Sequence, residues 1–236
     1  MTALPTPSSP ATAALFVRLQ AFNLLPSQTL HPERAAAWFP EAATLGPLAA
    51  HPAAQRSLHK RWSQRLLERL GDDALPVADL AHPALPLALA APELLARLVR
   101  DAGVLLLGRP LRRTILREQV LAAREGLGAE ALHWARTGAA ELHPGLDDAG
   151  PWLQQEHGAA HYAKAADQLG AGLLAQAWHD APAPLRRRAD WKLPPEADAA
   201  PLRSASGLDA AHARGLCLQL LARLDPQWLS SFPATR

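Results

Sequence analysis

Residues Pro92–Arg136 read PELLARLVRDAGVLLLGRPLRRTILREQVLAAREGLGAEALHWAR, and this stretch has the densest apolar periodicity in the chain. In both halves, leucine and alanine recur three and four residues apart, which is the spacing of one face of an α-helix. Gly108-Arg109-Pro110 separates the halves and predicts a hinge, because proline cannot continue an α-helix from the residues before it. The stretch therefore predicts two helices at the centre of an all-helical fold.

Each of these two helices has an expected buried face. The first helix is expected to bury Leu94, Leu95, Leu98, Ala102, Leu105 and Leu106. The second is expected to carry two apolar lines, one of Leu116, Val120, Ala123 and Leu127 and one of Leu111, Ile115 and Ala122. A helix that is apolar on two sides usually packs centrally, so the second helix is expected inside the fold.

Three arginines, Arg113, Arg117 and Arg124, lie between those two apolar lines, within roughly 40° of one another at about 100° per residue. No acidic residue stands three or four positions from any of them, so they lack intrahelical partners. Two roles stay open for them. They serve the fold or are simply solvated, or they form a candidate docking site for an acidic partner surface.

The remainder of the chain also favours helices. Apolar residues make up 49% of the sequence, with alanine and leucine abundant and valine and isoleucine scarce. Further helices are predicted over residues 13–25, 53–70 and 208–224, with proline-rich connectors between them. Residues 152–178 are predicted to form one or two helices, weakened in the middle by Gly170 and Gly172, with one apolar line of Tyr162, Ala166, Leu169, Leu173 and Ala177. Residues 1–12, rich in proline, serine and threonine, are predicted to be disordered. We predict an all-α protein with a single irregular helical domain at residues 13–236.

Composition excludes several classes of function. The formal charge of +2 gives no general attraction to nucleic acid, and aromatic residues do not alternate with the basic clusters. The helix over 53–70 has a basic face, which is either solvated or a binding surface. A single cysteine, Cys217, excludes an intramolecular disulfide and is expected to be buried. The chain shows neither a signal peptide nor an apolar run of the ~20 residues that span a bilayer, so a cytoplasmic protein without membrane insertion is expected.

Enzymatic motifs are weak. His157 and His161 stand four residues apart and could share a metal, but Gly158 occupies the position of the glutamate of zinc proteases and no third ligand is evident. Histidine precedes proline at four positions, which fits turns and helix starts better than catalysis. We expect a non-catalytic protein without a cofactor. A metal-dependent helical enzyme that uses His157 and His161 is kept as an alternative.

Five short segments together resemble one protein family. They are Leu30-His31-Pro32, the Leu-Gly-x-x-Leu-Arg-Arg segment at Leu107 to Arg113, Leu127-Gly128, Arg188-Ala-Asp-Trp-Lys-Leu-Pro194, and Leu224-Asp225-Pro226-Gln227-Trp228. In this order they resemble the SctK family (YscK, PscK and their relatives), accessory proteins of bacterial type III secretion systems. The proline-rich N-terminus and the alanine-rich region 140–180 depart from the family's pattern.

The resemblance implies a mainly helical, non-catalytic adaptor of the cytoplasmic sorting platform of the injectisome, at the inner-membrane face of the apparatus. Such an adaptor links the inner-membrane ring protein (SctD) to the pod protein (SctQ), which connects to the SctL stator and the SctN ATPase. The free protein is expected to be a monomer. A chaperone for secreted substrates is a further alternative.

Overall fold

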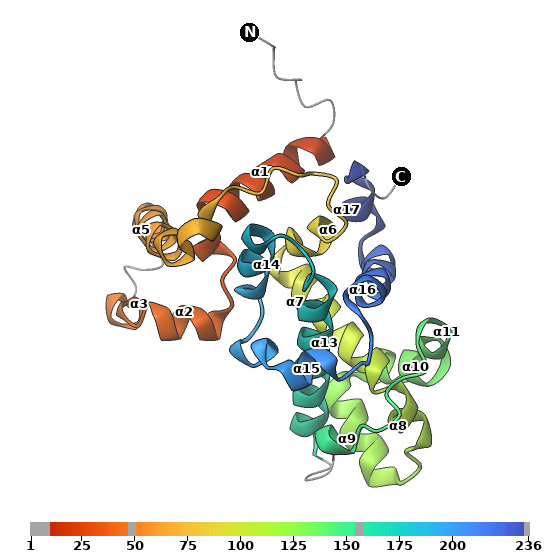
Figure 1. Cartoon of the computed structure of the whole chain (residues 1–236). Helices are drawn as coiled ribbons and strands as arrows, with labels where there is room; N and C mark the ends of the chain where they lie inside the picture. Colours follow the sequence, from red (N-terminus) through yellow and green to blue (C-terminus); the bar gives the residue numbers. More distant parts are fainter. Residues whose placement is uncertain (1–9, 47–50, 154–157, 234–236) are drawn as a thin grey trace. The chain divides into compact units, whose positions relative to one another are not determined.

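The computed structural model describes residues 10–46, 51–153 and 158–233 (Figure 1). Every regular element in those three ranges is an α-helix or a short 3-10 helix, so the all-α prediction is confirmed. Residues 1–9 of the segment predicted to be disordered lie outside the described residues. Residues 10–12 form the start of helix α1 (Pro10–Leu24).

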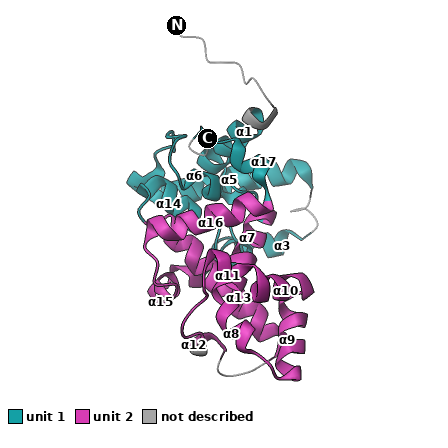
Figure 2. Cartoon of the chain, turned by 90° about the vertical axis from the view of Figure 1, so that its right-hand side faces the viewer, with its two compact units in different colours: residues 1–92, 180–195, 225–236 teal, residues 93–179, 196–224 magenta. Residues whose placement is uncertain are grey.

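The described chain forms two compact units, each made from segments that are distant in sequence (Figure 2). Unit 1 comprises residues 1–92, 180–195 and 225–236, and unit 2 comprises residues 93–179 and 196–224. The assignment of residues 13–236 to one domain stays a prediction.

Unit 1 contains both long and short helices and an aromatic and aliphatic core cluster. Leu30, Phe39, Leu66, Leu70 and Trp191 form the buried centre of this core. Besides α1, the helices are α2 (Pro32–Trp38), α3 (Glu41–Leu45), α5 (Pro52–Leu70), α6 (Leu85–Ala88), α14 (Ala183–Asp190) and α17 (Pro226–Ser230), with 3-10 turns at Pro26–Gln28 and Gly71–Ala74. The 53–70 prediction matches α5 to within one residue at its start.

The four His-Pro pairs act at turns and helix starts, as the sequence indicates. Each histidine accepts a hydrogen bond at its Nδ1 atom from the backbone N–H two residues later, across the proline, at 3.0–3.4 Å. At His31 and His51 the ring thereby caps the start of α2 and α5. Because proline has no N–H, the ring takes the first free donor of each turn.

Three buried cations bind backbone carbonyls inside unit 1. Arg34 donates to the carbonyls of residues 193 and 194, at 2.8 and 3.2 Å. Arg188 donates to the carbonyls of residues 73 and 74, at 3.2 and 2.7 Å. Lys192 donates to the carbonyls of residues 88 and 90, at 2.6 and 2.7 Å. These bonds join segment 180–195 to the first 92 residues, because each one links a residue of one to a residue of the other.

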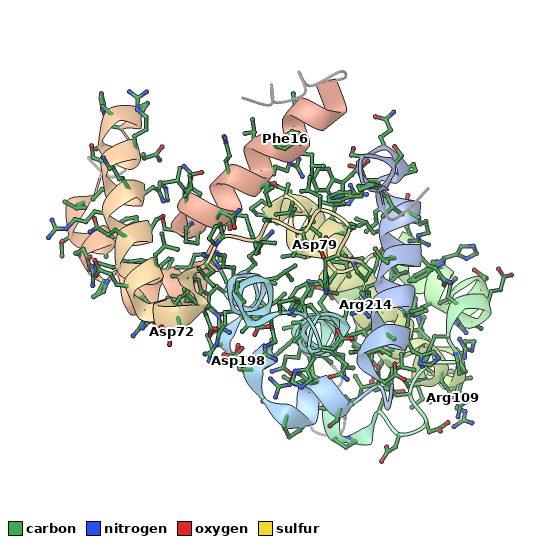
Figure 3. All side chains as sticks on the ribbon, turned by 45° about the horizontal axis from the view of Figure 1, so that its top comes forward. Phe16, Asp72, Asp79, Arg109, Asp198 and Arg214 are labelled. Atoms are coloured by element: carbon green, nitrogen blue, oxygen red, sulfur yellow. The ribbon has the colours of Figure 1, made fainter. Side chains whose placement is uncertain are left out.

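Unit 2 is organised around one long helix, α13 (Ala159–Ala177), which packs against α9, α15 and α16. Its expected inner line, from Tyr162 to Ala177, is buried. The remaining helices of unit 2 are α7 (Pro92–Leu106, of which Glu93 and the residues after it belong to this unit), α8 (Gly108–Arg113), α9 (Arg117–Leu127), α10 (Ala129–Thr137), α11 (Ala139–Leu142), α12 (Gly150–Leu153), α15 (Ala200–Ser204) and α16 (Ala210–Leu224). Arg214 on α16 donates to the carbonyl of Ala177 at 3.1 Å, closing the end of α13 (Figure 3).

Glycines allow helices α7 and α13 to touch through their backbones. A Cβ atom on Gly103 of α7 would lie 1.8 Å from the carbonyl oxygen of Ala166, and one on Gly170 of α13 would lie 1.8 Å from that of Val99. Helix α13 runs without a break through Gly170, and the expectation that Gly170 weakens it stays a prediction. Gly170 is required for packing, because any side chain there would overlap α7.

The central stretch is divided more finely than its periodicity predicts. The hinge falls at Leu107, between α7 and α8, and the expected buried face of α7 is confirmed. The second predicted helix is interrupted at residues 114–116, which leave the helical conformation between α8 and α9. Thr114 donates its hydroxyl to the carbonyl of Pro110 at 2.9 Å, and such side-chain bonds compete with helix continuation. β-branched Thr114 and Ile115 also lose side-chain freedom in a helix, which favours the interruption.

Candidate docking surface on α8 and α9

The interruption at 114–116 changes the geometry of the predicted arginine line. Arg117 and Arg124 remain on one face of α9, about 20° apart at about 100° per residue. Arg113 ends α8, so it lies outside that line and the predicted line of three is wrong as a single helical face. All three arginines are exposed, and none of their side chains forms a hydrogen bond or an ion pair with the residues that the structure describes.

Three other arginines of this region are engaged in the fold. Arg109 forms an ion pair with Asp147, and Arg112 donates to the carbonyls of Ala135 and Pro144, at 3.3 and 2.6 Å. Arg100 holds both carboxylate oxygens of Asp167, at 2.7 and 2.8 Å, and also donates to the carbonyl of residue 126. Arg97 and Arg136 are likewise exposed without a hydrogen bond or an ion pair among the described residues, so Arg113, Arg117 and Arg124 are distinguished by their exposed aliphatic neighbours rather than by being unpaired.

Three aliphatic side chains are exposed beside these arginines. Ile115 is 85% exposed, Leu116 60% and Leu121 51%. Ile115 and Leu116 are predicted from the sequence to be buried, and this prediction is wrong because the interruption turns both of them away from the core. We call Arg113, Ile115, Leu116, Arg117, Leu121 and Arg124 the α8–α9 surface. Exposed aliphatic residues among unpaired arginines are typical of a protein-binding surface rather than of a solvated one.

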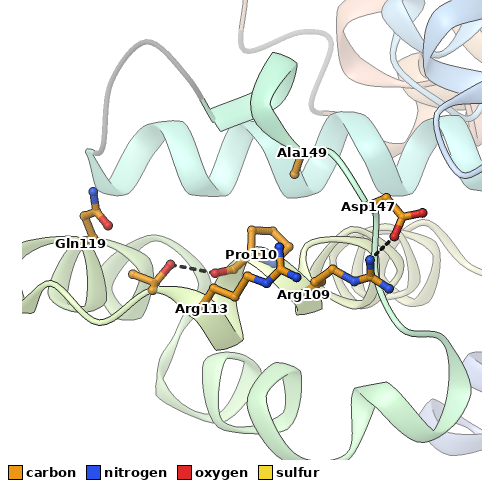
Figure 4. Close-up of a pocket in the computed structure, with 7 residues that line it drawn as sticks. Arg109, Pro110, Arg113, Gln119, Asp147 and Ala149 are labelled. Carbon is orange, nitrogen blue, oxygen red and sulfur yellow. Dashed lines mark hydrogen bonds and ion pairs between the residues drawn. The ribbon is translucent and has the colours of Figure 1, made fainter.

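A shallow cavity of about 240 Å³ adjoins the α8–α9 surface (Figure 4). In this cavity the side chain of Arg109 forms an ion pair with Asp147. The side chain of Arg113 lies beside Pro110 and forms no ion pair with Asp147. The nearby His143 has its pKa lowered, first by burial and then by the charge of Arg109. The cavity is lined by Arg109, Pro110, Arg113, Thr114, Gln119, Asp147 and Ala149. Because Arg109 is paired with Asp147, Arg113 is the unpaired cation of this cavity lining.

The basic face of α5 differs from the α8–α9 surface. Arg65 pairs with Glu41 at 2.5 Å and lies 5.1 Å from the centre of the Phe39 ring. Arg69 lies 4.8 Å from the centre of the Trp38 ring. Both arginines thus pack on the aromatic core of unit 1, which is worth about 0.5–1 kcal/mol for each such contact at exposed sites. Arg56, Lys60 and Arg61 are exposed, with no large exposed aliphatic residue on α5 beside them.

The candidate metal pair is described only in part. His157 lies outside the described residues, and His161 has a buried Nε2 atom without a hydrogen-bond partner. Within residues 10–46, 51–153 and 158–233, no three histidine, cysteine, aspartate or glutamate side chains are grouped so as to hold a metal ion. Cys217, expected to be buried, is fully so, and burial raises the pKa of its thiol. None of the described helices has both the length and the apolar character needed to cross a membrane.

Comparison of the chain with protein-family models, with curated proteins and with solved structures gives no match.

Proposed function

We propose that this protein is a non-catalytic adaptor of the type III secretion sorting platform, as its resemblance to the SctK family implies. In this role it works in the cytoplasm at the inner-membrane face of the apparatus. It links an SctD-like ring protein to an SctQ-like pod protein and, through it, to the SctL stator and the ATPase. The α8–α9 surface is the proposed docking site for one of these two partners.

The observation that carries this proposal is the α8–α9 surface itself. Arg113, Arg117 and Arg124 are exposed without partners among the described residues, next to three exposed aliphatic side chains. A partner with an acidic surface would neutralise the arginines and cover the aliphatic residues in one contact. Charged residues at the rim of such an interface mainly speed association and select the partner.

Three of the five segments behind the family resemblance lie outside α8 and α9, whereas Leu107 to Arg113 covers α8 and ends on Arg113 of the α8–α9 surface. The backbone N–H of His31 donates to the carbonyl of Trp191 at 2.9 Å, so the first segment binds the fourth. In the fifth segment, the indole N–H of Trp228 donates to the carbonyl of Pro86 at 3.0 Å. Because these residues bind the protein's own backbone, a resemblance in them concerns the fold more directly than it concerns any partner.

The proposal is tested by charge reversal on the α8–α9 surface. The variant Arg113→Glu/Arg117→Glu/Arg124→Glu is expected to lose about tenfold or more in affinity for an SctQ-like or SctD-like protein encoded nearby, equal to about 1.4 kcal/mol. The thermal melt should be unchanged, since all three side chains are exposed and unpaired. Binding of the wild type should weaken as salt is raised.

A matched control carries the same change of charge on α5, in Arg56→Glu/Lys60→Glu/Arg61→Glu. This control should bind like the wild type. Equal binding by both variants, or loss of the fold in the first, would remove the docking assignment. Capture of neither partner by the wild type would reject the adaptor proposal itself, and co-purification with a secreted substrate instead would favour a chaperone.

A further inference from the structure

Helix α9 carries a charge pattern of which the docking proposal uses only the arginines and Leu121. Its sequence places the pair Arg117-Glu118 and the pair Arg124-Glu125 seven residues apart, with Leu121 midway between them. At about 100° per residue, the two arginines lie about 40° and 60° to one side of Leu121, and the two glutamates lie about 40° and 60° to the other. The exposed face of α9 is therefore a leucine between a basic flank and an acidic flank.

The opposite side of α9 is fixed in unit 2. Ala123 and Leu127 are buried, and a Cβ atom on Gly126 would lie 2.0 Å from the carbonyl oxygen of Ala159 on α13. Arg100 of α7 also donates to the carbonyl of Gly126 at 3.0 Å. The Leu121 face is thus held outward. Glu118 and Glu125, like the two arginines, are exposed and form no ion pair within the described part of the chain.

This pattern is complementary to itself in one orientation only. A two-fold axis parallel to α9 exchanges the two flanks, so Arg117 and Arg124 of one copy lie opposite Glu118 and Glu125 of the other. When a two-fold axis perpendicular to α9 relates the two copies, the helices are antiparallel. The basic flank of one helix then faces the basic flank of the other, and the acidic flanks face each other, so like charges meet. Flanking charges of this kind set orientation and partner choice in helix pairs. The charges of α9 therefore favour a parallel pair and disfavour an antiparallel one.

We propose that the α9 face is a site of parallel self-association, whose occupant is α9 of a second copy of this protein. Leu121 packs against Leu121 of the copy, each basic flank meets the acidic flank of the other helix, and Ile115 and Leu116 extend the apolar contact. A pair of flanking charges seven residues apart spans about 10.5 Å of helix, so two ion pairs form along each side. This replaces the monomer expected from the sequence.

The charges also argue against other occupants. An anionic membrane would attract Arg117 and Arg124 but repel Glu118 and Glu125, which flank the same leucine at the same angles. The apolar part of the surface comprises few side chains, and stable interfaces bury about 800 Å² per partner, so the association is weak and concentration-dependent.

Two charge-reversed variants test the pairing. In Arg117→Glu/Arg124→Glu both flanks are acidic, and in Glu118→Arg/Glu125→Arg both are basic. Sedimentation velocity over a range of concentrations should show the wild type self-associating and each variant alone doing so at least about tenfold more weakly, since rim charges control such contacts. An equimolar mixture of the two variants should recover association, because opposite faces then meet. Leu121→Ser should weaken association in the wild type without any change in charge.

Three results would overturn the inference. They are a wild type that stays monomeric at the highest soluble concentration, variants that associate as well as the wild type, and a mixture that associates no better than its components. Far-UV circular dichroism of each variant confirms that these exposed changes leave the fold intact. The outcome is separable from the adaptor proposal, because Glu118→Arg/Glu125→Arg should weaken self-association while binding an acidic partner protein at least as well as the wild type.

Discussion

At the scale of single residues, the least expected feature is a lysine sealed inside unit 1. Lys192 is buried, and its Nζ atom donates to the carbonyls of Ala88 and Ala90. No carboxylate contacts it among the described residues. Burial, and next the charge of Arg18, lowers the pKa of Lys192 to about 7. The protonated amine is thus penalised in the folded state, because carbonyl dipoles replace its hydration only in part.

This lowered pKa predicts a pH dependence with a definite sign. The unfolded chain holds the proton of Lys192 up to about pH 10.4, and the folded chain releases it near pH 7. Folding stability should therefore rise with pH between these values, by up to about 1.4 kcal/mol per pH unit from this group. Lys192→Met should remove that rise, which urea unfolding at several pH values would measure.

The exposed Lys164 provides the control for this prediction. Lys164→Met should leave the pH dependence of the wild type unchanged. Identical pH profiles for Lys192→Met and the wild type would show that Lys192 keeps an ordinary pKa in the folded protein.

At the scale of elements, the α7–α13 contact depends on two glycines. A methyl group on Gly103 or Gly170 would meet a backbone carbonyl, which cannot move aside as a side chain can. We expect Gly103→Ala and Gly170→Ala each to destabilise the protein by about 3 kcal/mol, at the upper end of the cost of overpacking. Thermal or urea unfolding would measure the loss.

Gly215 in α16 is the matched control, since a Cβ atom there would meet no atom within 4 Å. Gly215→Ala should stabilise the protein by about 0.5–1 kcal/mol, because alanine loses less backbone entropy than glycine in a helix. Equal and small effects at all three positions would mean that α7 and α13 do not approach this closely.

These elements also show how far the sequence predicts the structure. Helical periodicity predicts the buried faces of α7 and α13, because burying one face imposes that spacing. The same rule fails at Ile115 and Leu116, where neither proline nor glycine marks the interruption. The absence of local partners for Arg113, Arg117 and Arg124 is evident from spacing alone. The exposure of these arginines cannot be predicted from spacing, because it depends on the interruption at residues 114–116 and on which distant segments cover each helix.

At the scale of the whole molecule, neither unit is one continuous segment. The chain passes between the units at residues 92/93, 179/180, 195/196 and 224/225. Unit 1 therefore depends on residues far along the chain, such as Trp191, which packs edge-on against Trp38 with ring centres 5.6 Å apart. These long-range contacts could not be predicted from the sequence, because no local pattern indicates that Arg34 donates hydrogen bonds to the carbonyls of residues 193 and 194.

This organisation predicts that residues 1–92 do not fold alone. In that fragment the buried guanidinium of Arg34 loses its acceptors at residues 193 and 194, and loss of hydrogen bonds to a buried charge is costly. We expect the fragment to show no cooperative melt by circular dichroism, whereas the full chain should melt cooperatively. A cooperative melt with dispersed amide resonances from residues 1–92 would contradict this.

Because Lys192 and Cys217 are buried in different units, the rate at which each is chemically labelled reports the opening of its own unit. The chain has one cysteine, sealed in unit 2, and three lysines, of which Lys60 and Lys164 are exposed while Lys192 is sealed in unit 1. A thiol reagent can therefore modify the native protein only when unit 2 opens, and an amine reagent can reach Lys192 only when unit 1 opens. Mass spectrometry of the two labelling rates would time the opening of each unit separately, with Lys60 and Lys164 as unprotected references and without any engineered probe.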